Sequence, residues 1–379
     1  MKRSLVLLTV LVISGTCCAR SLAKDSPELQ FFKDEQVTNG SAAVRVNRGY
    51  LIHSASVSAA KPSGNLDGDL SAALDVLEKS SRGGTMIKLH ICIAPDVFSG
   101  DTVSRFLAKR WPNGNAPVTT IVEASGGADV TLDAVWHSNS SELADLAPSD
   151  GVLSPNVDIL QLSGRAASGE LAEATSGTME QLFAVLRGLG ADRENVVQIK
   201  AFIQPIDQRE IVGQTIKDSF EELPVPPIVF VQWTSASRAT EIELIAEAPG
   251  KTDNAESTSY YTPPGDKSSP VYSRVGRIHG DEVIFIGGIA GTTNKTATEE
   301  VSTLYEGLKR IAAAAGTDLH HLAKATYYVS DDGASAALNE QRPGLYDPAR
   351  PPAASKVQVP GVGITDRGIV IDMVAAPSD

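Results

Sequence analysis

One series of predicted elements occurs three times along the chain, and this repeat limits the possible folds more than any other feature. The clearest copy spans residues 181–246 and begins with apolar residues at helical spacing. Alternating apolar residues over 197–203 predict a strand, and a second helical segment follows as far as Phe220. Two further strands, at 228–232 and 241–246, are separated by a polar turn and are predicted to form a hairpin.

Similar series precede and follow this copy, and their register can be checked by subtraction. Val118 and Ile228 begin equivalent predicted strands and are 110 residues apart. Asp133 and Glu243, in the strands that close the two copies, are also 110 residues apart. In the third copy the corresponding turn is three residues longer, an insertion that loops tolerate. Because a solenoid repeat has only about 20 to 50 residues, this period predicts three whole domains.

The three domains are predicted to cover 41–138, 151–249 and 268–377, with linkers rich in Gly, Pro and polar residues between them. Each domain begins with a pair of strands and continues as helix, strand, helix and two closing strands. This α+β order predicts a mixed sheet in each domain with two helices on one face. Alternate positions on the other face are apolar too, so that face needs partners, which the linked copies can supply.

The N-terminus is predicted to be a signal peptide over 1–23, with cleavage after Ala19 or Ala23. Its apolar run, LVLLTVLVI, is shorter than the roughly 20 residues that a membrane-spanning helix needs. Lipidation of Cys17 is the alternative for this segment, although the threonine before it fits that processing poorly. The mature protein is predicted to be exported, periplasmic or secreted, without a membrane span.

Composition excludes several classes of function. The net charge is −13 and no basic cluster follows the leader, which disfavours nucleic-acid binding through phosphate contacts. Only Cys92 lies in the body of the chain, so no internal disulfide can form. Its apolar neighbours favour core packing over a role as nucleophile. We expect no cofactor, because no GxGxxG or P-loop pattern occurs, and no metal, because His320 and His321 are adjacent and point in different directions.

Several segments together resemble one known family, the RidA/YjgF-type proteins. They are LSGRAASGE at 162–170, GLGADRENVVQIKAFI at 188–203, PPIVFVQW at 226–233, AAGTDLHHLAKATYYVSD at 314–331 and RPPAASKVQV at 350–359. The resemblance covers 43–376 as three tandem copies, of which the first is the most diverged. Members of this family hydrolyse reactive enamines and imines, and they are usually homotrimers with a chorismate-mutase-like fold and clefts between subunits. Three copies in one chain therefore imply a monomer that forms an intramolecular pseudo-trimer.

The family's substrate-binding arginine is missing from the matching positions. That arginine follows a Pro-Ala pair and holds the substrate carboxylate with a planar fork of donors. The resemblance places Val118, Ile228 and Ala354 at that position, and none of them can bind a carboxylate. Arg165 or Arg238 could compensate for the loss through space.

Other family positions are partly retained. The family's glutamate, which positions or activates water, is matched by Thr131, Glu241 and Val370, so only Glu241 keeps the carboxylate. The resemblance also matches the following residues to family site positions: Ser163, with Ser54 as a further candidate in the first domain, Tyr272 and Asn339. Each has a structural alternative: Glu241 as a solvated strand residue, Ser163 as a turn residue, Tyr272 as interface packing and Asn339 as a helix cap.

Two functions follow from this pattern. In the first, the protein binds a small metabolite in an interdomain cleft without the family's imine hydrolysis; in the second, one cleft remains an enamine or imine deaminase, or a related hydrolase, that uses Glu241. Loss of the arginine from every copy favours the first. The retained residues point to the boundary between the second and third domains. There, desolvation should raise the pKa of Glu241 and favour neutral or cationic ligands.

Overall fold

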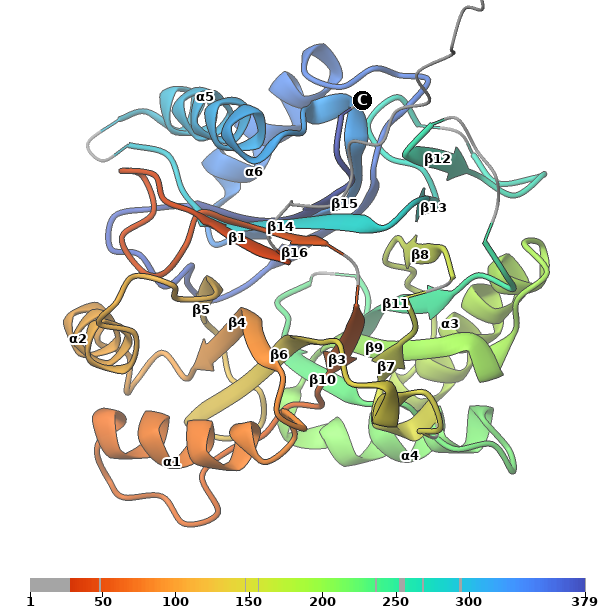
Figure 1. Ribbon diagram of the computed structural model, residues 1–379, viewed down its shortest axis with the longest axis horizontal. Coiled ribbons are helices and arrows are strands. Elements are labelled where there is room, and N and C mark those ends of the chain that lie inside the picture. The colour runs from red at the N-terminus through yellow and green to blue at the C-terminus, as the bar shows by residue number, and fades with distance from the viewer. Residues whose placement is uncertain are drawn as a thin grey trace, which may run out of the picture.

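The computed structural model describes residues 28–47, 49–146, 148–155, 157–235, 237–251, 256–267, 269–292 and 295–378. Within them the fold is mixed α+β, with three mixed sheets and six α-helices (Figure 1). The predicted signal peptide over 1–23, including Cys17, lies outside the described residues. Among the helices of the described part, none is both long enough and apolar enough to cross a membrane.

In space, the strands of each sheet lie in an order that differs from their order along the chain. The first sheet consists of β5 (Val118–Glu123), β4 (Thr85–Ile93), β6 (Val130–Ser138), β3 (Tyr50–His53) and β7 (Val152–Leu153). The second sheet consists of β10 (Ile228–Gln232), β9 (Val196–Ile203), β11 (Thr240–Glu247), β8 (Ile159–Leu162), β13 (Val275–Ile278) and β12 (Thr258–Tyr261). The third sheet consists of β1 (Leu29–Phe32), β2 (Ala43–Asn47), β14 (Glu282–Ile289), β17 (Ile369–Ala375), β15 (Leu322–Val329) and β16 (Ala353–Gln358). The helices are α1 (Leu66–Glu78), α2 (Gly100–Arg110), α3 (Leu171–Arg187), α4 (Arg209–Ser219), α5 (Ala297–Ala315) and α6 (Asp332–Gln341).

Each sheet is built around one unit with the order strand, helix, strand, helix, strand, strand. We call 50–138 the first unit, 159–247 the second and 282–375 the third. In the second unit, β9 pairs in parallel with β10 on one side and antiparallel with β11 on the other. The hairpin predicted from 228–232 and 241–246 is therefore wrong, although both strands form. The helical crossover through α4 places β10 parallel to β9 at the edge of the sheet, and the next strand returns to the other side of β9.

A strand that precedes each unit pairs with the sheet of another unit. β2 pairs with β14 of the third unit, β7 with β3 of the first and β13 with β8 of the second. Figure 1 shows β1 and β2, at the red end of the chain, beside β14. The strand pairs predicted at the starts of the first and third domains are thus divided between two sheets, because their partners lie far away along the chain.

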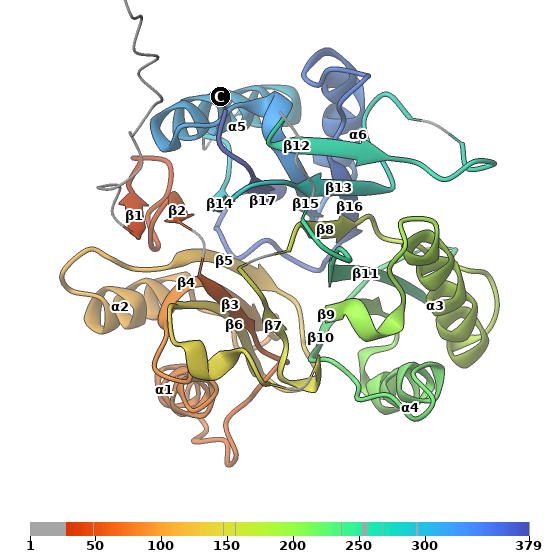
Figure 2. The same ribbon diagram turned by 45° about the vertical axis from the view of Figure 1, so that its right-hand side comes forward.

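The helices lie outside and the sheets face one another in the middle (Figure 2). Each unit has its own apolar core between helices and sheet, with Leu74, Leu186 and Leu308 as buried helix residues in the three cores. On the inner faces, two further apolar clusters combine residues from all three sheets. Cys92 is buried in one of these clusters, where it packs as predicted from its apolar neighbours. The second face of each sheet therefore finds its partners in the other two units.

Strand pairing both supports and corrects the register obtained by subtraction. Asp133, Glu243 and Asp372 occupy matching places, opposite His90, Lys200 and Thr326 respectively. The offset of 110 residues fails, however, for the strand that begins near residue 118.

The correct match in that strand is one residue later. Ile228 pairs with Ile199, whose counterpart in the first unit is Leu89. Leu89 pairs with Thr119, not Val118. The connection between β5 and β6 is one residue shorter than its counterpart in the second unit, which shifts the match. The position of the family's arginine is thus held by Thr119 in the first unit.

Candidate functional site

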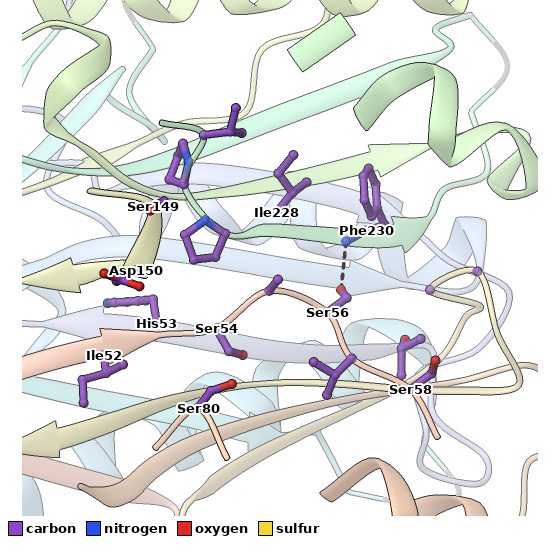
Figure 3. Close-up of a pocket in the computed structure, with 18 of the residues that line it drawn as sticks. Ile52, His53, Ser54, Ser56, Ser58, Ser80, Ser149, Asp150, Ile228 and Phe230 are labelled. Atoms are coloured by element: carbon purple, nitrogen blue, oxygen red, sulfur yellow. Dashed lines mark hydrogen bonds between the residues drawn. The ribbon is translucent and has the colours of Figure 1, made fainter. Parts of the chain in front are cut away.

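A cavity of about 930 Å³ lies between the first and second units. It is bounded by β3, the loop after β3 and the start of β6 on one side, and by the start of α4 and by β10 on the other. Figure 3 shows His53, Ser54 and Ser56 facing Ile228 and Phe230 across it. Its volume falls within the roughly 300 to 1,000 Å³ that is usual for small-molecule sites.

Hydrogen bonds that each involve at least one main-chain group hold the two walls of this cavity together. The Ser56 N–H donates to the Ile228 carbonyl oxygen at 3.1 Å, and the Phe230 N–H donates to the Ser56 hydroxyl at 3.1 Å. The Gln198 amide donates to the Ser54 carbonyl oxygen at 2.8 Å. These bonds fix the loop after β3 against β10, so the cavity is preformed.

The charged residues around the cavity are mainly cations. Lys79, Arg82 and Arg209 line it together with one acid, Asp150. Arg82 and Asp150 form an ion pair at 2.9 Å. Within the described part of the chain, neither Lys79 nor Arg209 forms an ion pair. The cavity therefore carries an excess of positive charge in a chain whose net charge is −13.

His53 is a buried polar group in the wall of the cavity. Its side chain is 3% exposed, and the Gln198 side chain lies near enough to its ring to raise the pKa, although neither ring nitrogen reaches good hydrogen-bond geometry with a described residue. Burial, together with the charge of Lys88, lowers the pKa of His53 to about 4, so the ring is neutral near pH 7. A neutral imidazole offers one donor and one acceptor. The charged groups that act on this ring, Lys88, Asp133 and Lys200, line a smaller cavity where the three sheets meet, and His53 lines that cavity as well.

The groups that the family uses for hydrolysis are absent from this junction. Thr131, which pairs with Cys92, takes the place of the glutamate, and Ile228 takes the place of the arginine. Ser54 does not occupy the place of Ser163: Val57 corresponds to Arg165 in the isolated strand pairing, so the serine position falls on Ala55. The one carboxylate among the described lining residues, Asp150, is paired with Arg82.

At the junction of the second and third units, Ser163 has a structural role. Its hydroxyl donates to the Ser273 carbonyl oxygen at 2.6 Å and accepts from the Ala354 N–H at 2.7 Å. Ser163 is 1% exposed. Both sides of the hydroxyl are therefore occupied by main-chain groups of the third unit.

Glu241 lies beside the turn that Ser163 begins. A Cβ added at Gly164 would overlap the Glu241 carboxyl group, so the glycine makes room for this side chain. Burial, followed by the charge of Glu243, raises the pKa of Glu241 to about 7. Lys324, Ser355 and other neighbours lower it by less. The direction and its first cause, burial, are those expected from desolvation, and a group with such a pKa can exchange a proton near neutral pH.

Asn339 does not cap a helix; its side chain accepts hydrogen bonds from two cationic side chains. Its Oδ1 accepts hydrogen bonds from Lys356 Nζ and Arg342 Nη2, each at 3.1 Å. Burial and then the charge of Arg342 lower the pKa of Lys356, while Glu241 raises it. Lys356 lies two residues along β16 from Ala354, on the same face of the strand, and Ala354 matches the arginine of the RidA/YjgF-type proteins. The sequence alone did not identify Lys356 as a candidate.

The arginines proposed as substitutes are engaged elsewhere. Arg165 forms an ion pair with Asp266, which also pairs with Arg274 at 3.0 Å. The Arg274 guanidinium lies over the Tyr272 ring at 5.2 Å, so this tyrosine packs at the junction.

Arg238 donates a hydrogen bond to Ser168. Arg165 is therefore occupied by an acid, whereas Arg238 is exposed and its guanidinium bonds only to a serine hydroxyl among the described residues. The junction of the second and third units contains all four predicted site residues, Ser163, Glu241, Tyr272 and Asn339. The cavity lies instead between the first and second units.

The raised pKa of Glu241 predicts a specific dependence of stability on pH. Between about pH 4.5 and 7 the folded chain keeps a proton that the unfolded chain releases, so stability falls as pH rises through this window. Glu241→Gln should remove this contribution and stabilise the protein relative to wild type above pH 7. Urea unfolding of both proteins across the window measures the effect. A difference in unfolding free energy that does not change with pH would contradict it.

Comparison with known proteins gives limited similarity. No family model matches the chain, and no curated protein matches it. Solved structures match about a third of it. A YjgF-family protein from Neisseria meningitidis is 24% identical with a TM-score of 0.25, and the match covers 32% of this chain and 96% of that one. A member of the YjgF/YER057c/UK114 family from Mycobacterium tuberculosis is 20% identical with a TM-score of 0.23, covering 32% of this chain and 99% of that one. Yeast Mmf1 is 16% identical with a TM-score of 0.23, covering 32% and 99%. Similarity at this level carries no weight for function, which has to be argued from the residues of this chain.

Proposed function

We propose that this protein binds a small molecule in the cavity between its first and second units and does not perform imine hydrolysis there. The observation that carries the proposal is a preformed cavity of about 930 Å³ whose lining contains more cations than acids. Thr131 and Ile228 supply neither a general base nor a carboxylate fork. Binding is therefore expected without turnover.

The proposal includes an intramolecular pseudo-trimer of three RidA-like units in a monomeric, exported chain. The exchange of strands between units and the shared inner clusters support this arrangement. The apolar run in 1–23 supports export. The alternative, a surviving hydrolase, would have to use Glu241 at the second junction, where Lys356 rather than an arginine lies nearby.

The charges of the cavity indicate the class of ligand. Lys79, Arg82 and Arg209 outnumber Asp150, and Arg209 is partly buried, so its charge attracts an anion more strongly than the exposed Lys79 and Arg82 do. Ile228 and Phe230 provide an apolar surface opposite the serines. A small anion with an apolar group fits both sides. The preference for neutral or cationic ligands predicted around Glu241 concerns the other junction and remains a prediction there.

A set of three ligands that differ only in charge tests this function. Phenylacetate, phenylacetamide and phenethylamine share one apolar group, and calorimetry should show that phenylacetate binds most tightly. Arg209→Gln should weaken its binding by about tenfold, because a charge-assisted contact is lost. Arg187→Gln, a change of the same kind at an exposed site on α3, should leave binding unchanged, as should Glu241→Gln. Equal affinity for the amide, or no effect of Arg209→Gln, would overturn the proposed function.

A further inference from the structure

The amino group of Lys356, on β16 of the third unit, is held in place by two side chains of α6. Its Nζ donates to the Ser335 hydroxyl at 2.9 Å and to Asn339 Oδ1 at 3.1 Å. Arg342 donates to the same Asn339 oxygen at 3.1 Å. Lys356 is only half-buried and Asn339 is exposed. A small solute can therefore reach a lysine whose position is fixed.

No carboxylate among the described residues is in ion-pair contact with Lys356. The Glu241 carboxyl group of the second unit lies near enough for its charge to act on Lys356, and it is half-buried as well. The amine and the carboxyl group are thus neighbours from different units that do not neutralise each other by direct contact.

The surroundings of Lys356 favour its nucleophilic form. Burial and then the charge of Arg342 lower the pKa of Lys356 and outweigh the opposite effect of Glu241, so more of the amine is neutral than in an ordinary lysine. A neutral amine has two N–H bonds and one lone pair. Ser335 and Asn339 can accept both N–H bonds, which leaves the lone pair free. Desolvated lysines beside a second cation form imines with carbonyl compounds.

Glu241 can supply the proton that imine formation needs. Burial, followed by the charge of Glu243, raises the pKa of Glu241 to about 7. Near neutral pH this group is therefore present both as an acid that donates a proton and as a carboxylate that accepts one. Its acid form and the neutral amine are both uncharged, so an uncharged carbonyl compound fits the reacting pair.

We propose that the Lys356 amino group captures small, uncharged aldehydes or ketones as a reversible imine, with Glu241 as the proton donor. The Nζ lone pair forms a bond to the carbonyl carbon, and one nitrogen proton passes to the carbonyl oxygen to give a carbinolamine. Glu241 then donates its proton to the hydroxyl group, the C–O bond breaks and water leaves. The remaining nitrogen proton returns to the Glu241 carboxylate. One amine and one carbonyl compound yield one imine and one water molecule.

This reactive site is separate from the cavity between the first and second units. It goes beyond the ligand binding proposed for that cavity and does not depend on it, because different residues carry it. Failure of one proposal would leave the other standing.

Reductive trapping on the full chain tests the reactive lysine. Sodium cyanoborohydride reduces an imine to a stable secondary amine, so butanal with this reagent near pH 7 marks the amines that form imines. Peptide mapping by mass spectrometry at short times should find Lys356 modified several-fold faster than Lys217, which is exposed on α4. The mapping also separates Lys356 from the N-terminal amine. Equal modification of Lys356 and Lys217 would overturn the proposal.

Three variants separate the nucleophile from the proton donor. Lys356→Arg should remove the early adduct, whereas Lys217→Arg should retain it. Glu241→Gln is the sharpest variant, because loss of its charge lowers the pKa of Lys356 and would accelerate trapping, whereas loss of its proton should slow trapping. Enough cyanoborohydride is used that the rate no longer depends on it, so imine formation is measured. Faster or unchanged trapping in Glu241→Gln would exclude Glu241 as the proton donor.

Discussion

Glu243→Gln is expected to lower the free energy of unfolding by about 3 to 5 kcal/mol, because it leaves a buried ammonium without its counter-charge. Lys324 of the third unit donates to three groups: the Glu243 carboxylate, the Ser355 hydroxyl at 3.0 Å and the Leu162 carbonyl oxygen at 3.1 Å. Glu243 and Leu162 belong to the second unit. The substitution therefore weakens the attachment of one unit to another, and urea unfolding measures the loss.

The same chemical change at an exposed ion pair provides the control. Glu78→Gln breaks the pair with Arg110 at the surface and should cost less than about 1 kcal/mol. Combining Glu243→Gln with Lys324→Met removes both charges and should recover part of the lost stability. If Glu243→Gln costs no more than Glu78→Gln, the buried pair does not hold the units together.

Gly276→Ala is expected to destabilise the protein by about 3 kcal/mol or more, because the new methyl group has no space. Gly276 lies on β13, where that strand crosses β15 of the third unit. An added Cβ would overlap the Ala323 carbonyl oxygen and lie 2.8 and 2.9 Å from two other main-chain atoms of Ala323. Main-chain atoms in a strand cannot turn aside as a side chain can. The second and third sheets would have to separate.

Gly344→Ala is the matched control, since no atom lies within 4 Å of its added Cβ. Thermal and urea unfolding should show almost no change for this variant. A similar small effect of Gly276→Ala would mean that the two sheets are not in such close contact.

The sequence predicted the local elements and most of their register. Helical and strand periodicity located the repeated series, and the matching of Asp133 with Glu243 agrees with the observed pairing. Such features depend on nearest neighbours along the chain, which pattern analysis can detect. The pairing of one strand with another does not depend on neighbours along the chain. Consecutive strands such as β10 and β11 read as a hairpin, although β9 lies between them.

The prediction of candidate site residues was limited for the same reason, because it could not include contacts between distant segments. Matching single positions to a family motif located Ser163 and Glu241 at one junction, together with Tyr272 and Asn339. It could not indicate that Lys356 would approach from the next position on the strand. It also could not indicate that His53 and Lys200 would be buried, because their burial depends on contacts between units. Such contacts also form the cavity between the first and second units.

The exchange of strands has a consequence for the order in which the molecule can be completed. A ribosome makes β1 and β2 first and β14 to β17 last, yet these strands share one sheet. The earliest segment must therefore wait, with its strand edge unpaired, until the final unit has been synthesised. Domain-by-domain folding during synthesis can finish the first and second sheets once β7 and β13 have emerged, but not the third. A circular permutant that begins at the linker near residue 256 would synthesise β14 to β17 before β2 and reverse this order of completion.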